Sequence, residues 1–239
     1  MTRAGGSRVT AMRRLAPLAV VVTLGLVGCG DSDGGSSESE QTGPTGESSS
    51  TEPSSTSSAS STWSPAPLAT EGVSFDQQLH DELMAMFRRD QAGQKGGIDN
   101  EGPDARIERL KEIIAEHGWP TLDLVGKDGG DAAWIIAQHA DLDPDFQAAA
   151  LELLTEAAEA GQASWGNVAY LEDRVAAGNG EPQTYGTQIG CVRGKAKLAT
   201  PLTQPDRVDE LRAKAGLDPL DVYLAELDKI CAREQERGR

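Results

Sequence analysis

The chain has 239 residues, and its 38 acidic against 22 basic residues give a formal net charge of −16. Nucleic acid binding needs a basic surface that neutralises phosphates, so we expect no nucleic acid partner. The same acidity disfavours electrostatic adhesion to anionic lipid, and either a well-solvated surface or cationic partners would account for it.

The first 28 residues have the three-part organisation of a secretory signal. Four arginines precede the apolar run Leu15 to Val27, and the small residue Gly28 follows it. Thirteen helical residues span about 20 Å, which is well short of the roughly 30 Å hydrocarbon core of a bilayer. We therefore predict a cleaved signal peptide at residues 1–28 rather than a permanent transmembrane helix.

The run Leu26-Val27-Gly28-Cys29 resembles the bacterial lipobox. The resemblance implies that a signal peptidase cuts before Cys29 and that this cysteine is acylated, for example with palmitate. Two or three acyl chains hold a protein stably at a membrane. We expect a lipoprotein anchored to the cell membrane on its extracytoplasmic face, with the lipid as its membrane contact. The alternative is an ordinary signal peptide followed by an incidental cysteine.

Residues 29–72 form a linker crowded with Ser, Thr, Gly, Glu and Pro. From Gly30 to Gly72 it contains no Lys, Arg, Val or Ile, and it cannot bury enough apolar surface to offset its backbone entropy. We predict a disordered stalk between the lipid and the folded part of the chain.

Residues 73–239 are long enough for a single compact domain, and their apolar residues recur mostly at helical spacing. Ser74, Asp143 and Ser164 are expected to cap helices at their N-termini. After residue 180 the period changes, and 184–192 with 196–202 predict a small β-hairpin. The fold class is mainly α: a multi-helix domain with one small β-hairpin, preceded by a signal peptide and a disordered stalk. Helices are expected at residues 75–92, 103–117, 131–140, 144–160, 165–177, 205–215 and 219–233.

One of these helices, 131–140, is apolar nearly all round and is expected at the centre of the fold. Trp134 on this helix is expected in the core. Trp119 and Trp165 each lie beside a glycine at a helix boundary and are candidates for the edge of a sugar or peptide groove.

Three cysteines are present. If Cys29 carries lipid, Cys191 on the hairpin and Cys231 on the last helix remain as a pair, and an oxidising exterior favours a disulfide between them. Two separate thiols are the alternative.

Four runs resemble those of an uncharacterised bacterial domain-of-unknown-function family, over about residues 76–223. That family has no established activity, so the resemblance implies no mechanism. Asp90-Gln91 also resembles an Asp-Gln pair of the family, but the arginine expected soon after it is replaced by a Gly/Lys-rich stretch. The four runs are His117-Gly118-Trp119-Pro120, Gln138-His139-Ala140-Asp141, Tyr170-Leu171-Glu172-Asp173-Arg174-Val175 and Pro182-Gln183-Thr184-Tyr185-Gly186-Thr187-Gln188.

Polar residues of these runs suggest one shared cleft. His139 is a candidate general base or acid, with Asp173 or Asp141 orienting it and Arg174 holding a negative charge. The alternative is structural: Gln138 and His139 would cap their own helix, and Asp173 and Arg174 would form an internal ion pair or hold the hairpin backbone. The candidates for ligand binding are Gln138, Gln183, Tyr185 and Gln188.

No GxSxG, SxxK, GxxxxGK or GxGxxG motif is present, which disfavours familiar serine enzymes and nucleotide-dependent enzymes. No paired histidine spacing suggests a metal site, and we expect no cofactor. We favour a non-catalytic envelope module that binds a wall fragment, a small molecule or another protein. A cofactor-independent hydrolase or lyase using His139, Asp173 and Arg174 is the alternative.

Overall fold

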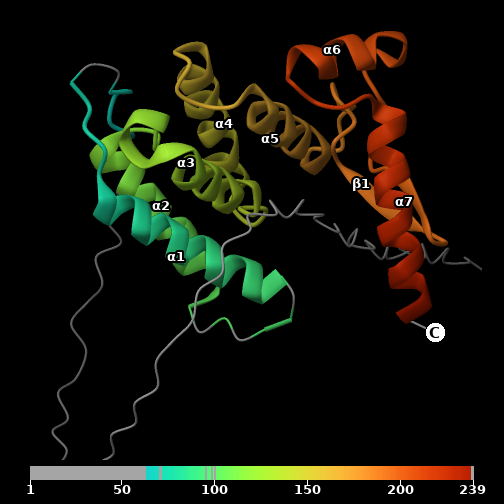
Figure 1. The fold of residues 1–239 in the computed structure, drawn as a ribbon, viewed down its shortest axis with the longest axis horizontal. Coiled ribbons are helices and arrows are strands. Elements are labelled where there is room, and N and C mark those ends of the chain that lie inside the picture. Colours follow the sequence, from blue (N-terminus) through green and yellow to red (C-terminus); the bar gives the residue numbers. More distant parts are fainter. Residues whose placement is uncertain (1–62, 70–71, 95, 98, 100, 238–239) are drawn as a thin grey trace, which may run out of the picture. The chain divides into compact units, whose positions relative to one another are not determined.

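Helices dominate the part of the chain that the computed structural model describes, which comprises residues 63–69, 72–94, 96–97, 99 and 101–237 (Figure 1). The signal peptide, Cys29 and most of the linker lie outside these residues. None of the described helices is both long and apolar enough to cross a membrane. The elements in chain order are α1 (Gln77–Gln94), α2 (Gly102–His117), α3 (Leu122–Gln138), α4 (Pro144–Glu159), α5 (Trp165–Gly178), β1 (Ile189–Val192), β2 (Lys195–Leu198), the 3₁₀ helix η1 (Pro205–Arg207), α6 (Val208–Lys214) and α7 (Leu220–Arg237).

This architecture confirms the predicted fold class, a mainly α domain with one hairpin. Helix α3 contacts α1, α2, α4 and α5, as expected for a helix that is apolar nearly all round. Ala133, Ile136 and Ala137 of α3 are at most 1% exposed. The helix begins earlier than predicted, at Leu122, and Gly126 interrupts it with a φ of 72°. Gly126, Gly129 and Gly130 in the first half of α3 interrupt the apolar periodicity from which the helix was predicted.

Short polar side chains cap the N-termini of α1, α3, α4 and α5. Asp143 accepts from the amide of Phe146 at 3.1 Å, and Ser164 accepts from the amide of Gly166 at 3.1 Å, as predicted. The predicted cap Ser74 is wrong, because Asp76 accepts from the amide of Leu79 at 3.0 Å and α1 begins after it.

Some residues assigned to the linker, which was expected to run to residue 72, pack against the helices, among them Trp63 and Ala66. The Trp63 indole donates to the backbone carbonyl of Lys111 at 2.9 Å, and its ring meets that of Phe146 edge to face at 5.5 Å. The amide of Ala66 donates to the carbonyl of Ile114 at 3.0 Å. A single tryptophan in a Ser- and Pro-rich run is enough to fix this segment on α2 and α4, because an aromatic ring buries a large apolar area.

The hairpin pairs β1 with β2 in antiparallel register, Cys191 opposite Ala196. Arg193 and Gly194 both have positive φ, 52° and 75°, which fits the two-residue turn that matches strand twist. The first strand is shorter than predicted because backbone amides within residues 184–187 donate to the carboxylate of Asp173 on α5. A disulfide joins Cys191 to Cys231 on α7, with the Cα atoms 5.3 Å apart, and confirms the predicted pairing.

A buried Asp–His pair at the end of helix α3

His139 is the residue that follows α3, and its imidazole is held by a carboxylate from a distant helix. Nδ1 of His139 lies 2.8 Å from Oδ2 of Asp90, near the C-terminal end of α1. The two side chains are 5% and 3% exposed. The pair exists because α1 packs along α3, which brings together residues 49 positions apart in the sequence.

The surroundings of Asp90 keep its carboxylate in place. Gln91 donates to the same oxygen, Oδ2, at 3.1 Å. Arg106 of α2 lies 3.6 Å from Oδ1 and also contacts Asp99 at 2.6 Å. Arg106 is 4% exposed, so its cation compensates buried negative charge. An arginine therefore does accompany the Asp90-Gln91 pair, but it comes from α2 rather than from the residues that follow the pair.

This arrangement favours one tautomer of the neutral His139 ring. A carboxylate only accepts hydrogen bonds, so Nδ1 of the imidazole carries the hydrogen that lies towards Asp90. The other nitrogen, Nε2, is buried and has no hydrogen-bond partner among the described residues. In hydrolytic triads a carboxylate orients the histidine in the same way, through Nδ1–H, while Nε2 faces the nucleophile.

Asp173, predicted to orient His139, instead holds the segment before the hairpin. Its carboxylate is fully buried and accepts from the amides of Thr184 at 2.7 Å, Tyr185 at 3.1 Å and Thr187 at 2.8 Å. The Thr187 hydroxyl is a fourth donor, at 3.0 Å. These contacts match the alternative interpretation, in which Asp173 links α5 to the hairpin backbone.

Arg174, the third candidate for catalysis, forms an ion pair with Asp141. Its Nε donates to Oδ1 of Asp141 at 2.8 Å, and a second guanidinium nitrogen contacts Oδ2, which makes the pair bidentate. A further nitrogen donates to the side chain of Gln188 at 3.1 Å. The guanidinium is thus engaged within the protein, and among the described contacts it does not meet His139.

Two of the four predicted ligand-binding residues are occupied by the fold itself. Gln183 is fully buried and donates to the carbonyls of Gln188 and Thr200, while its side-chain oxygen accepts from the amide of Gln188 at 2.7 Å. Gln188 donates to the carbonyl of Tyr170 and accepts from Arg174. Both glutamines therefore stabilise the approach to the hairpin.

The other two candidates are Tyr185 and Gln138. Tyr185 is half-buried, and burial raises the pKa of its hydroxyl above the usual value. Gln138 donates to the carbonyl of Tyr170 at 3.4 Å, and its side-chain oxygen is buried without a partner in the described structure.

Helix α3 is capped by a residue that the sequence did not reveal. Nε2 of Gln147, on α4, donates to the carbonyls of Ala137 and Gln138 at 3.3 and 3.2 Å. The structural alternative, in which the ring of His139 caps these carbonyls, is not observed, because that ring contacts Asp90 instead.

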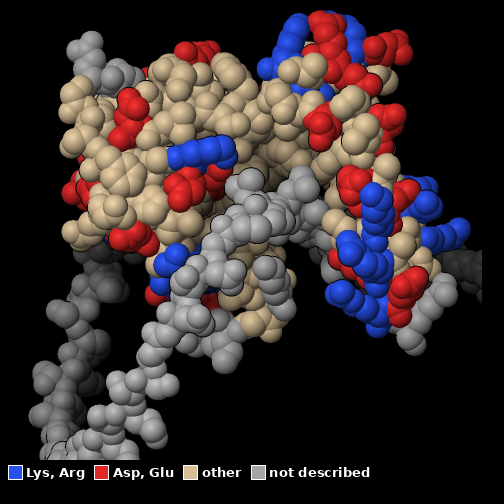
Figure 2. All heavy atoms as spheres, viewed as in Figure 1, with Lys and Arg blue, Asp and Glu red and all other residues tan. Residues whose placement is uncertain are grey.

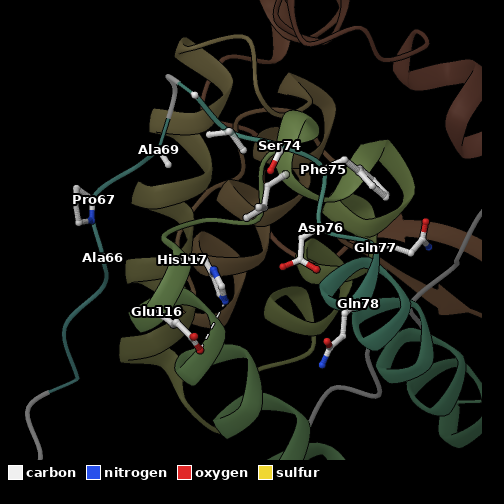
Figure 3. Close-up of a pocket in the computed structure, with 13 residues that line it drawn as sticks. Ala66, Pro67, Ala69, Ser74, Phe75, Asp76, Gln77, Gln78, Glu116 and His117 are labelled. Atoms are coloured by element: carbon white, nitrogen blue, oxygen red, sulfur yellow. Dashed lines mark ion pairs between the residues drawn. The ribbon is translucent and has the colours of Figure 1, made fainter.

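A separate open hollow of about 870 Å³ lies between residues 66–69 and 72–78 on one side and the end of α2 on the other (Figure 3). His117 and Glu116 contribute to its wall with Asp76, and Nε2 of His117 is 3.6 Å from the Glu116 carboxylate. His139 and its partners are not among the residues that line this hollow.

Charge is unevenly distributed on the surface. On the face shown in Figure 2, lysine and arginine side chains gather over α6 and α7, whereas acidic side chains are spread more widely. Arg193 and Lys197 of the hairpin and Arg233 of α7 are exposed basic residues in the C-terminal part of the chain. Within the described residues no three His, Cys, Asp or Glu side chains are grouped as a metal site.

Fold and site together define a mainly helical domain with an apolar core and a buried Asp–His pair between α1 and the end of α3. The chain belongs to a family of unknown function, DUF6624, whose model matches residues 76–233. This agrees with the expected membership of a domain-of-unknown-function family. No curated protein and no solved structure matches the chain.

Proposed function

We propose that the chain is a lipid-anchored protein of the extracytoplasmic cell envelope whose helical domain binds a small polar ligand through His139. The anchoring part rests on the lipobox-like run that ends in Cys29. The disulfide between Cys191 and Cys231 supports it, because structural disulfides persist in oxidising compartments outside the cytoplasm.

The ligand-binding part rests on one observation, the buried and unpartnered Nε2 of His139. A buried polar atom without a partner costs about 1–3 kcal/mol, so folded proteins rarely retain one without a reason. Because Asp90 holds the hydrogen on Nδ1, Nε2 of the neutral ring can only accept. A ligand with a hydroxyl or N–H donor would pair with this nitrogen and recover that free energy.

A second candidate function, a cofactor-independent hydrolase or lyase, is supported by the same pair. An imidazole with Nδ1–H bound to a carboxylate is well placed to take a proton from water or from substrate at Nε2 and to return it to a leaving group. In this form of the hypothesis Asp90 replaces Asp173 as the residue that orients His139. Arg106, through its contact with Asp90, positions that carboxylate.

The test is a thermal-shift screen of the purified full chain against muropeptides, amino sugars and small metabolites. His139→Gln removes the accepting nitrogen, and His117→Gln is a matched control on the unrelated hollow. A ligand at 100 times its Kd should stabilise wild type by about 2.7 kcal/mol. We expect the same stabilisation in His117→Gln and none in His139→Gln.

Equal stabilisation of His139→Gln by every ligand that stabilises wild type would contradict the proposal. Circular dichroism of the variant at low temperature establishes that it is folded. Consumption of a stabilising ligand by wild type but not by His139→Gln would favour the enzyme over the binding module.

A further inference from the structure

Two more buried polar atoms without partners lie one turn apart on α3. They are Nε1 of Trp134 and Oε1 of Gln138, and neither has a hydrogen-bond partner among the described residues. The two residues are spaced i and i+4, so their side chains are neighbours on one face of the helix. This face is turned to α5, because both side chains contact Tyr170.

Both side chains lie against Tyr170 of α5. Gln138 donates from Nε2 to the backbone carbonyl of Tyr170 at 3.4 Å, which turns Oε1 away from that carbonyl. The Trp134 ring meets the Tyr170 ring edge to face at 5.9 Å. Helix side chains lean towards the N-terminus, so the Gln138 side chain leans towards Trp134.

The two atoms are chemically complementary. An indole nitrogen can only donate a hydrogen bond, and an amide oxygen can only accept one. They do not bond to each other in the structure. A group that bridges them must accept from Trp134 and donate to Gln138, and a hydroxyl oxygen is the smallest group that does both.

We propose that a hydroxyl oxygen bridges Nε1 of Trp134 and Oε1 of Gln138 on the seam between α3 and α5. It is supplied either by a bound water or by the hydroxyl of a sugar or other polyol. An ammonium group could donate to Gln138 but could not accept from Trp134. A bare anion could accept from Trp134 but would face the partial negative charge of the amide oxygen.

This site is independent of the proposed role of His139. The His139 ring is held by Asp90 of α1, whereas Trp134 and Gln138 contact α5. Buried waters usually make about three hydrogen bonds, and the bridge between Trp134 and Gln138 supplies two of them.

The experiment is NMR of the full chain labelled with ¹⁵N at its indole nitrogens, which gives signals only from the four tryptophans. The Trp134 signal is assigned with Trp134→Phe, or by elimination with Phe at the other three positions. Magnetisation transfer from water is then measured in buffer alone and with glucose as the polyol probe. The exposed Trp165 serves as the control for ordinary solvent exchange.

We expect a cross-peak between the Trp134 indole proton and a long-lived hydroxyl proton. A cross-peak to water that glucose leaves unchanged assigns the oxygen to a bound water. Its replacement by a cross-peak to glucose assigns the oxygen to a polyol, and both results support the bridge. Gln138→Leu should accelerate exchange of the Trp134 indole proton, since it removes one anchor of the oxygen. The absence of a hydroxyl cross-peak in wild type under both conditions would overturn the inference, whatever the variants do.

Discussion

Replacing Asp173 with asparagine tests whether this carboxylate supports the fold rather than chemistry at His139. The side chain is fully buried and receives four donors, three backbone amides and one hydroxyl. Hydrogen bonds to a charged acceptor contribute about 1.5–3 kcal/mol each, and a buried donor left unpaired costs about 1–3 kcal/mol. Asparagine keeps the shape and one accepting oxygen but turns an NH₂ group towards two of the donors.

We therefore expect Asp173→Asn to lower the free energy of unfolding by about 3–5 kcal/mol, a large part of the 5–15 kcal/mol typical of a domain. Urea denaturation of the full chain, followed by far-ultraviolet circular dichroism, measures this change. The matched control is Asp145→Asn, because Asp145 is an exposed carboxylate in the first turn of α4. A loss below about 1 kcal/mol for Asp173→Asn would refute the reasoning, because the four donors would then have other partners.

Three further changes have defined outcomes. Cys191→Ser removes a disulfide with a sequence separation of 40 residues and should lower the free energy of unfolding by about 4 kcal/mol by the chain-entropy relation. An unchanged midpoint of urea denaturation would show that the disulfide is not formed in solution. Burial raises the pKa of Glu172 above its ordinary 4.5, so the stability that its protonated form contributes is present below pH 4.5 and is lost as the pH rises through the folded-state pKa. Glu172→Gln should therefore raise the melting temperature at pH 7 and leave it unchanged below about pH 4. An equal effect at both pH values would contradict the raised pKa. Trp63→Ala should cost about 2 kcal/mol and expose the segment before α1 to proteases, whereas wild-type stability and cleavage would show that this segment is not packed.

The helices could be predicted from sequence because their determinants are local. Asp143 followed by Pro144, and the apolar stripe behind them, define the start of α4 without reference to the rest of the chain. The Cys191–Cys231 pair was also predictable, since two cysteines remain when Cys29 is assigned to lipid. Helix α3 was predicted only in its second half, because glycines such as Gly126 obscure the pattern of the first.

The partners in the site could not be predicted in the same way. His139 and Asp90 are 49 residues apart, and nothing local indicates that α1 packs beside the end of α3. Asp173 and Arg174 are adjacent in sequence, which suggested one polar set. Consecutive residues of a helix point about 100° apart, however, so each meets a different neighbour. The family-like run around Asp90-Gln91 was the one available signal for the true partner of His139.

Trp119 shows how a boundary position can mislead. Its place beside Gly118 suggested the edge of a groove, and that prediction is wrong, because the ring is 1% exposed and belongs to the main core. Trp165, predicted on the same grounds, is 44% exposed. Both tryptophans lie beside a glycine at a helix boundary, so only tertiary packing distinguishes the buried Trp119 from the exposed Trp165.

The proposed role of His139 depends most directly on the tautomer of its ring, which ¹⁵N NMR of the imidazole nitrogens in the full chain can measure. Three histidines are present, so comparison with His139→Gln assigns the signals. In the neutral ring we expect hydrogen on Nδ1, with a downfield proton that Asp90→Ala removes, and a bare Nε2 that responds to added ligand. Hydrogen on Nε2 with a bare Nδ1 would contradict the orientation by Asp90, and with it the proposed role of His139.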